Sequence, residues 1–405
     1  MANIMQTSVV PQERFSAIEG LRGYMALWVL AAHCLGAAGY EIDQLHGVIK
    51  MIRDAGYAVD VFVIVSGFVI SRLIIKSRER YIVFIGRRFF RLFPLYALCM
   101  VAGAMLTNLL IWNLNASGEW ITEQRLHSEL HIITSIFQNF WENVALCTLM
   151  LQGVVPQSIV PYAPNGFLGT AWSISLEWQF YLIAPLLVPS LLGNNGRTTL
   201  VISWLTVLAL FVLAQLKWLP QVVHGAFLPC HIEFFLIGIA SYGMLLKLTS
   251  PRVSGSTEAR SITHLVFGAL TISFLLFPLA AGTRPLLPYL IWLVVVSLLV
   301  QKQVGMPDIF TRLLDWMLSS RIVLFLGEIS YGIYLVHLIA IYLIQGLLFL
   351  AFPELGQMGH FLALLLLVSL LTVALSTVLH YTIERPAIRF ARKVFTSRPA
   401  TSEFR

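Results

Sequence analysis

The sequence predicts an all-α, polytopic integral membrane protein with about ten transmembrane helices and both termini in the cytoplasm. Hydrophobic residues make up 58% of the 405 residues and charged residues 12%, about half of the roughly 25% that is typical of soluble domains. Several apolar runs are long enough to cross a bilayer, which takes about 20 residues. The distribution of Lys and Arg then indicates the orientation of the chain.

Ten apolar segments are candidates for the membrane spans. They cover residues 23–40, 57–75, 92–112, 171–192, 199–216, 227–246, 263–281, 286–301, 323–350 and 360–382. The first 13 residues are polar and no small-residue cleavage pattern follows, so we expect no removable signal peptide. We expect one membrane domain over residues 1–395 and a cytoplasmic tail over 396–405.

The Lys and Arg residues divide unevenly between the two sides of this topology. With both termini in the cytoplasm, 22 of the 27 fall on the cytoplasmic side. The outer side keeps five, which are Lys50, Arg53, Arg125, Lys217 and Arg284. This is the positive-inside pattern, so we expect a multi-pass protein of the inner (cytoplasmic) membrane. The net charge of +7 belongs to cytoplasmic loops, and we expect no nucleic-acid partner.

The long outer segment over residues 113–170 is the least regular part of the chain. Its apolar stretch at 144–155 is short for a span, and a Pro-rich turn follows it. We interpret the stretch as interfacial or re-entrant, because a full crossing would invert every later loop. Aromatic residues near this segment suit stacking on sugar rings or interfacial anchoring. They are Trp112, Trp120, Trp141, Tyr162 and Trp172.

The four cysteines indicate neither a disulfide framework nor a zinc site. None of them forms a CxxC pair, and most fall in apolar segments. We therefore expect no bound metal.

The first span carries an arginine and a histidine on one helical face. Arg22 and His33 are eleven positions apart, and eleven residues return to within about 20° of the start while rising about 16 Å. We expect Arg22 near one membrane surface and His33 at depth. A histidine buried in hydrocarbon is costly and is a functional candidate, or it serves to hold helices together.

Two arginines end the second cytoplasmic loop. Arg88 and Arg91 are at positions i and i+3, so they project from one face. Positive-inside anchoring alone explains many such loops. The guanidinium group, however, suits phosphate oxygens better than the ammonium of lysine does. Together with Arg22, these side chains form a candidate site for a polyphosphate ligand.

The fourth span carries a polar stripe. Ser173, Glu177 and Tyr181 follow i, i+4, i+8, and Glu177 lies about two turns below the outer surface. A carboxylate at that depth needs a partner, a water-filled cavity or a proton. An ion pair with His231 or Arg88 that only packs helices is the alternative.

The ninth span carries a second polar stripe. Tyr331, Tyr334 and His337 follow i, i+3, i+6. An aromatic belt accounts for tyrosines near an interface but not for His337 at mid-membrane. In the second span, Asp60 precedes a Ser-Gly pair at 66–67, which is typical of close helix contact.

Taken together, these motifs resemble the acyltransferase-3 family of membrane-bound acyltransferases. The resemblance covers residues 13–390 and rests on six motifs in family order. They are Arg22 with His33, Asp60 to Phe68, Arg88 with Arg91, Trp172 to Tyr181, Tyr331 to His337, and Tyr381 to Pro386. Glu19 stands where the family usually has aspartate, and Val63 where it has a second phenylalanine. Some members carry an extracytoplasmic esterase-like domain, which we do not expect here.

The resemblance implies an O-acyltransferase that moves an acyl group, most often acetyl, from cytoplasmic acyl-CoA to a hydroxyl. Acetyl-CoA is then a substrate, and we expect no permanently bound cofactor. The implied acceptor is a carbohydrate or another hydroxylated molecule outside the membrane, as in polysaccharide modification. The implied catalytic residues are His33, Glu177 and Asp60. The implied CoA-binding residues are Arg22, Arg88 and Arg91. The implied substrate-binding residues are Ser173, Tyr181, Tyr331, Tyr334 and His337.

Two mechanisms and several functions are open at this point. His33 is either the general base for direct transfer or is itself acylated. We favour direct transfer, because a tunnel open to both ligands needs no alternating step. A proton-coupled transporter is the competing function, since intramembrane His, Glu and Asp also mark proton pathways. Acylation of a small molecule such as an antibiotic, and a non-catalytic CoA sensor, are further alternatives.

Overall fold

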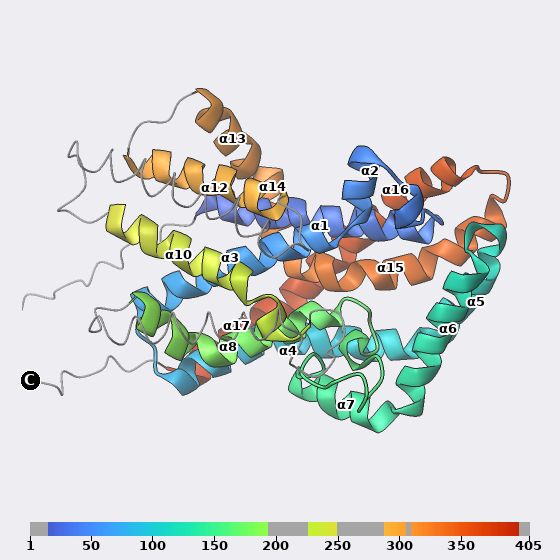
Figure 1. Ribbon diagram of the computed structural model, residues 1–405, viewed down its shortest axis with the longest axis horizontal. Coiled ribbons are helices and arrows are strands. Elements are labelled where there is room, and N and C mark those ends of the chain that lie inside the picture. Colours follow the sequence, from blue (N-terminus) through green and yellow to red (C-terminus); the bar gives the residue numbers. More distant parts are fainter. Residues whose placement is uncertain (1–14, 193–225, 249–286, 305–308, 397–405) are drawn as a thin grey trace, which may run out of the picture.

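Helices account for the regular structure of the computed structural model, which describes residues 15–192, 226–248, 287–304 and 309–396. No β-strand occurs within these ranges. The helices are α1 (Ser16–Ala37), α2 (Gly47–Arg53), α3 (Gly56–Ser77), α4 (Tyr81–Met105), α5 (Thr107–Ala116), α6 (Glu123–Gln138), α7 (Phe140–Leu149), α8 (Ala171–Leu192), α10 (Ile232–Leu248), α12 (Leu287–Val304), α13 (Ile309–Ser319), α14 (Arg321–Glu328), α15 (Ser330–Ala351), α16 (Gln357–Leu379) and α17 (Arg385–Val394). Figure 1 shows the long helices side by side, with α5 and α6 at one end of the bundle.

Five helices in the described ranges are long and apolar enough to cross a membrane. They are α3, α4, α8, α15 and the continuous helix of α16 and α17. Two shorter apolar helices, α10 and α12, coincide with predicted spans at 227–246 and 286–301. The predicted spans at 199–216 and 263–281 lie outside the described residues. The all-helical membrane class is therefore confirmed, while the count of ten spans stays a prediction.

The helix at the third predicted span, 92–112, has other bounds than that apolar segment. Helix α4 starts at Tyr81 rather than at residue 92 and ends at Met105. Arg88 and Arg91 made the segment before 92 look like a loop, because charged residues lower the local hydropathy. In the structure these two arginines lie inside the helix and face a cavity between helices, so they need not contact lipid.

The ninth predicted span, 323–350, consists of two helices. Helix α14 ends at Glu328, and α15 begins at Ser330. Close packing holds α14 against α1: a Cβ atom added to Gly327 would overlap the backbone of Glu19, and one added to Gly23 would meet the backbone of α14. Small residues allow this approach of two helix backbones.

The Ser-Gly pair of α3 marks a second close contact between helices. A Cβ atom added to Gly67 would overlap the backbone of Phe235 in α10. One added to Gly238 of α10 would overlap the backbone of Ile64 in α3. The two backbones are therefore in direct contact, which holds α3 in place as one wall of the cavity described below.

The segment 113–170 folds as a cap at one end of the bundle (Figure 1), and its membrane position stays a prediction. The apolar stretch 144–155 consists of the end of α7 and a turn, and Met150 ends α7 in the left-handed conformation (φ 55°). Buried Gln152 then donates hydrogen bonds to Tyr96 Oη (3.1 Å) and Ala171 O (3.1 Å). These bonds attach the turn to α4 and α8.

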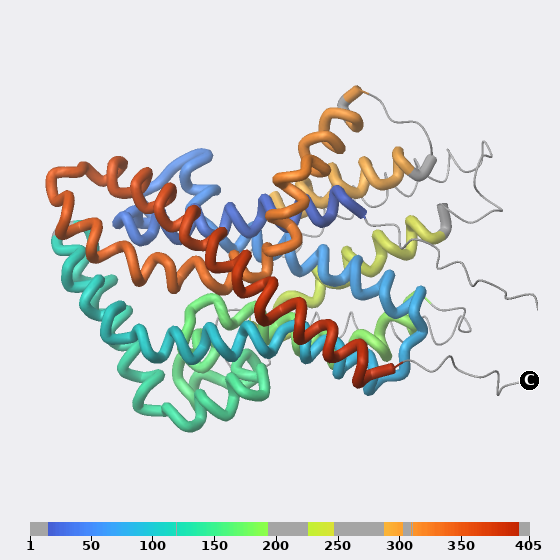
Figure 2. Tube along the Cα trace, turned by 180° about the vertical axis from the view of Figure 1, so that it is seen from behind, coloured from blue at the N-terminus to red at the C-terminus, as the bar shows by residue number. Residues whose placement is uncertain are grey.

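The described chain begins and ends toward the same side of the bundle. Figure 2 shows α1 beginning, and α17 ending, toward the same end of the molecule. Between α16 and α17 the helix passes through a π-helical turn over His380–Glu384. Arg385, directly after that turn, donates to Glu328 Oε1 (2.5 Å), and this hydrogen bond lowers the pKa of Glu328. The C-terminal helix is thus attached to the junction of α14 and α15.

Candidate active site

A polar cavity lies between α1, α3, α4, α8 and α15, and we call it the inner cavity. Its empty volume is about 760 Å³. Valine, isoleucine and phenylalanine side chains form its apolar walls. Its polar lining consists of Arg22, Ser66, Arg88, Arg91, Ser173, Glu177, Tyr181, Ser330, Tyr331 and Tyr334. Both polar stripes of the sequence therefore contribute to one cavity.

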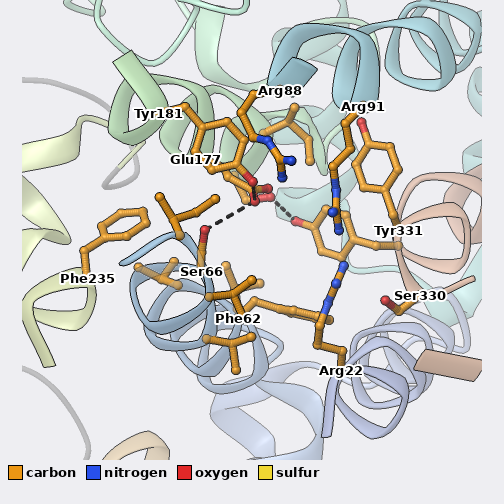
Figure 3. Close-up of a pocket in the computed structure, with 18 residues that line it drawn as sticks. Arg22, Phe62, Ser66, Arg88, Arg91, Glu177, Tyr181, Phe235, Ser330 and Tyr331 are labelled. Carbon is orange, nitrogen blue, oxygen red and sulfur yellow. Dashed lines mark hydrogen bonds between the residues drawn. The ribbon is translucent and has the colours of Figure 1, made fainter. Parts of the chain in front are cut away.

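Three arginines converge in the inner cavity from two helices. Arg22 of α1 and Arg91 of α4 extend toward each other, and Arg88 of α4 reaches in beside Glu177 (Figure 3). The buried Nε of Arg88 has no hydrogen-bond partner among the described residues. Three guanidinium groups against one carboxylate leave the cavity lining with an excess of positive charge. Such a cavity favours an anion with several oxygen atoms.

Glu177 is held at the wall of the inner cavity by hydrogen bonds. It accepts from Tyr181 Oη and from Ser66 Oγ (3.3 Å), as Figure 3 shows for Ser66. The three arginines of the cavity also interact with it electrostatically. Placing a carboxylate at this depth of the membrane costs free energy. Two hydroxyl donors, the cavity and the neighbouring cations offset that cost.

A second cavity lies beside the cap, and we call it the outer cavity. Its empty volume is about 1350 Å³. Leucine and isoleucine side chains of α5, α6 and α15 form its apolar walls. Its polar and aromatic lining consists of His33, Ser117, Trp120, Arg125, Glu129, Asn165, Trp172, Tyr342 and Gln345. Of the aromatic residues considered for sugar stacking, Trp120 and Trp172 line this cavity, whereas Trp141 is 76% exposed.

The two cavities approach each other at α8 and α15. Trp172 lines the outer cavity, and the next residue, Ser173, lines the inner one. On α15, Tyr334 lines the inner cavity and Leu338, about one turn later, lines the outer one. The hydroxyls of Ser173 and Tyr334 are 2.6 Å apart and connect the two helices at this boundary.

Two histidines meet at the boundary between the cavities. His33 of α1 lines the outer cavity. His337 of α15 lies one residue before Leu338 and is completely buried. The Nε2 atom of His337 is 3.3 Å from the Nδ1 atom of His33, and the ring centroids are 4.9 Å apart.

Backbone carbonyls determine which nitrogen of each ring carries the proton. The Nδ1 atom of His33 lies 2.8 Å from Val29 O, and Nδ1 of His337 lies 3.1 Å from Ile333 O. A carbonyl oxygen can only accept a hydrogen bond, so we assign the proton of each neutral ring to Nδ1. The Nδ1–H of His33 is then shared between Val29 O (2.8 Å) and Nε2 of His337 (3.3 Å), and Nε2 of His33 is the basic nitrogen that is available to a substrate.

The predicted catalytic residues do not all lie beside His33. Asp60 lines neither cavity, and its Oδ1 lies 3.4 Å from Nε2 of His231. His231, which the sequence suggested as a partner of Glu177, is therefore paired with Asp60. Glu177 lines the inner cavity, whereas His33 lines the outer one. Among the described side chains, the hydrogen-bonding neighbour of His33 is His337.

The predicted substrate-binding residues lie mainly on the side of the arginines. Ser173, Tyr181, Tyr331 and Tyr334 line the inner cavity. Tyr331 Oη donates to Leu92 O (2.8 Å), so this hydroxyl already has a partner. Helical spacing predicted that these residues share faces but did not indicate toward which cavity each face turns.

Several polar residues of the outer cavity were not singled out as site residues by the sequence, among them Gln345, Arg125 and Glu129. Gln345 carried a usable signal, because it is a polar residue in the middle of an apolar span. Arg125 and Glu129 carried none, because they belong to a polar helix of the outer segment that is typical of a solvated surface.

Comparisons with known proteins point to acyl transfer. Residues 15–381 match the family model Acyl_transf_3, described as "Acyltransferase domain". The chain is 24% identical over 412 residues to acyltransferase MdmB of Streptomyces mycarofaciens, a match that covers 96% of this chain and 97% of that protein. It is 27% identical over 380 residues to BcsY of Komagataeibacter xylinus, which is named as a membrane-bound transacylase, with 92% and 84% covered. The comparison with solved structures finds no match.

Proposed function

This chain belongs to the acyltransferase family whose model matches residues 15–381, and from that premise we propose that it is an O-acyltransferase that works across the membrane. The donor is a cytoplasmic acyl-CoA, with acetyl-CoA as the first candidate. The acceptor is a hydroxyl group of a carbohydrate or another molecule on the outer side. His33 is the catalytic base.

The observation that carries this proposal is the placement of two polar cavities on either side of a histidine pair. The inner cavity has an excess of positive charge, while the outer cavity carries His33 and two indole rings. About one helical turn of α15 separates their linings. Two substrates that enter from opposite ends of the bundle would therefore meet beside His33 and His337.

The inner cavity suits the donor. CoA carries phosphate groups, and guanidinium groups bind phosphate oxygens with charge-assisted hydrogen bonds. Arg22, Arg88 and Arg91 supply these groups, and the free Nε of Arg88 is a donor that still needs an acceptor. The narrow pantetheine arm would extend from the arginines toward the boundary of the two cavities. That arrangement brings the thioester near His33.

The reaction needs a base for the proton of the acceptor hydroxyl. Nε2 of His33 takes this proton while the hydroxyl oxygen attacks the thioester carbonyl carbon. The carbon–sulfur bond then breaks, and the protonated His33 returns the proton to the sulfur of CoA. The hydroxyls of Ser173 and Tyr334 lie at the boundary, where Ser173 donates to Tyr334 and Tyr334 donates to Thr170 O (3.2 Å); either hydroxyl would have to leave its present acceptor to donate to the carbonyl oxygen as it becomes negative.

Purified protein in lipid nanodiscs, supplied with radiolabelled acetyl-CoA and a panel of methyl glycosides, tests the proposal. We expect the His33→Ala and His33→Gln variants to lose about 10²-fold or more of the transfer rate, since a positioned base contributes that much. His46→Ala is the matched control, because His46 is exposed in the connection between α1 and α2. A His33 variant that transfers at the wild-type rate excludes this base. Activity that needs an ion gradient and consumes no acetyl-CoA would indicate a transporter instead.

Sealed vesicles of known orientation test the sidedness. Acceptor on the outer face should be acylated when acetyl-CoA is present on the cytoplasmic face alone. Equally fast acylation of acceptor added only to the cytoplasmic face contradicts transfer across the membrane. Label that stays on His33 after rapid quenching without acceptor would favour an acyl-histidine intermediate over direct transfer.

A further inference from the structure

The outer cavity contains a carboxylate that the proposed reaction does not use. Glu129 of α6 lines this cavity and is partly buried. Its side chain forms no hydrogen bond or ion pair with the described residues. Burial raises the pKa of Glu129, because the carboxylate has lost part of its hydration, and the nearby charges of Arg125 and Arg53 oppose this effect. A ligand with hydrogen-bond donors would supply a partner.

Charged groups of both signs surround Glu129. Arg125, in the same cavity, forms an ion pair with Glu41 (3.2 Å). Arg53, which also interacts electrostatically with Glu129, donates its Nε–H to Tyr40 O (3.1 Å). Arg125 and Arg53 therefore stand against Glu129 and Glu41, Asp54 also interacts with Arg53, and a charged ligand would disturb this arrangement. An uncharged ligand that carries hydroxyl groups would not.

Flat aromatic surfaces accompany the carboxylate. Trp120 and Trp172 both line the outer cavity. The ring of Trp120 packs against His360 and Phe349, at centroid distances of 5.0 and 6.0 Å, so its position is fixed by neighbours. Indole faces pack well against C–H groups, while a carboxylate accepts from hydroxyls. The combination suits a ring with hydroxyls on its edge and C–H groups on its faces.

We propose that the outer cavity is the acceptor site and that Glu129 and Trp120 select an uncharged, polyhydroxylated ring, which is the chemistry of a neutral sugar. Glu129 accepts hydrogen bonds from neighbouring hydroxyls, and Trp120 covers one ring face. His33, on the same cavity, faces the hydroxyl that is acylated. This inference rests on the proposed transfer reaction, and it assigns acceptor recognition to the cap rather than to the tyrosines of the inner cavity.

The kinetic test compares Glu129→Gln with Glu142→Gln, an exposed glutamate of α7 that serves as control. The probes are the methyl glycosides of glucose, galactose and mannose, with glucosamine as a cationic analogue. We expect Glu129→Gln to raise the KM for the accepted sugar at least about tenfold and to leave the KM for acetyl-CoA unchanged. An unchanged sugar KM overturns the proposal, as does consumption of acetyl-CoA with acylation of none of the sugars. A preference for glucosamine that Glu129→Gln abolishes would identify a cationic acceptor and overturn the neutral one.

A labelling test does not depend on turnover. Ile132 lines the outer cavity, so an Ile132→Cys variant should react with a maleimide, and the accepted sugar should slow that reaction. Adding Glu129→Gln should remove the protection. Ile159→Cys, at a position that is 66% exposed, is the control that sugar should not protect. Protection without any consumption of acetyl-CoA would refute the proposed function alone, whereas no protection by any sugar would refute the acceptor site.

Discussion

The arginines of the inner cavity are the side chains on which donor binding should depend most directly. Arg88→Ala and Arg91→Ala should each weaken acetyl-CoA binding by about 1.5–3 kcal/mol if each guanidinium donates a charge-assisted hydrogen bond to phosphate. Lysine at either position should restore part of the affinity, because it keeps the charge but loses the planar fork. Equilibrium binding of labelled acetyl-CoA measures the effect.

Arg389→Ala provides the control for loss of one cytoplasmic positive charge. Arg389 is exposed on α17 and lines neither cavity. If the Arg88→Ala/Arg91→Ala double variant binds acetyl-CoA as tightly as the wild type, these arginines serve as membrane anchors.

His337 is a positioning residue in this scheme, because it acts through His33. Its Nε2 accepts from the Nδ1–H of His33, which keeps the other nitrogen of His33 basic. We expect His337→Ala to lower kcat about 10- to 100-fold, as loss of an orienting partner does at metal-bound histidines. The KM for acetyl-CoA should stay the same, since His337 lines neither cavity. A variant that changes KM and leaves kcat intact would contradict a positioning role.

The contact between α3 and α10 should be sensitive to a single methyl group. Gly238→Ala would place Cβ against the backbone of Ile64, which cannot move without shifting α3. We expect the variant to lose about 1–3 kcal/mol of stability, the usual cost of overpacking. Thermal unfolding in nanodiscs measures it. Gly356→Ala is the control, because a Cβ atom there meets no atom within 4 Å. Equal melting temperatures for the two variants would show that α3 and α10 accommodate the added methyl group without loss of stability.

The topology of the whole chain gives a prediction that needs no activity. Tags at both termini and in the 247–262 loop should be accessible from the cytoplasm, and a tag within 113–165 should be accessible from outside. Within the described residues, α1 begins and α17 ends toward the same end of the bundle (Figure 2). Accessibility labelling of intact and permeabilised cells decides the sides. A cytoplasmic tag near residue 160 would mean that the stretch 144–155 crosses the membrane.

The sequence by itself was sufficient for the class of protein and for the residue types of the site. Hydropathy and charge are local properties, so 58% hydrophobic and 12% charged residues already indicate a helical membrane protein. Helical spacing predicted that Arg88 and Arg91 share a face, and both do line one cavity with Arg22. The family also followed from short motifs, and the family model confirms it over residues 15–381.

Only the tertiary structure shows which polar helix faces lie against one another. His33 and His337 are 304 positions apart, and no periodicity within one helix indicates that their rings are neighbours. Glu177 turned out to face the arginines rather than His33, because its direction depends on how α8 packs against α3 and α4. Glu129 looked like a solvated surface residue until the cap brought α6 over the cavity of His33. Contacts between distant helices are set by the packing of the whole bundle, which local sequence patterns do not encode.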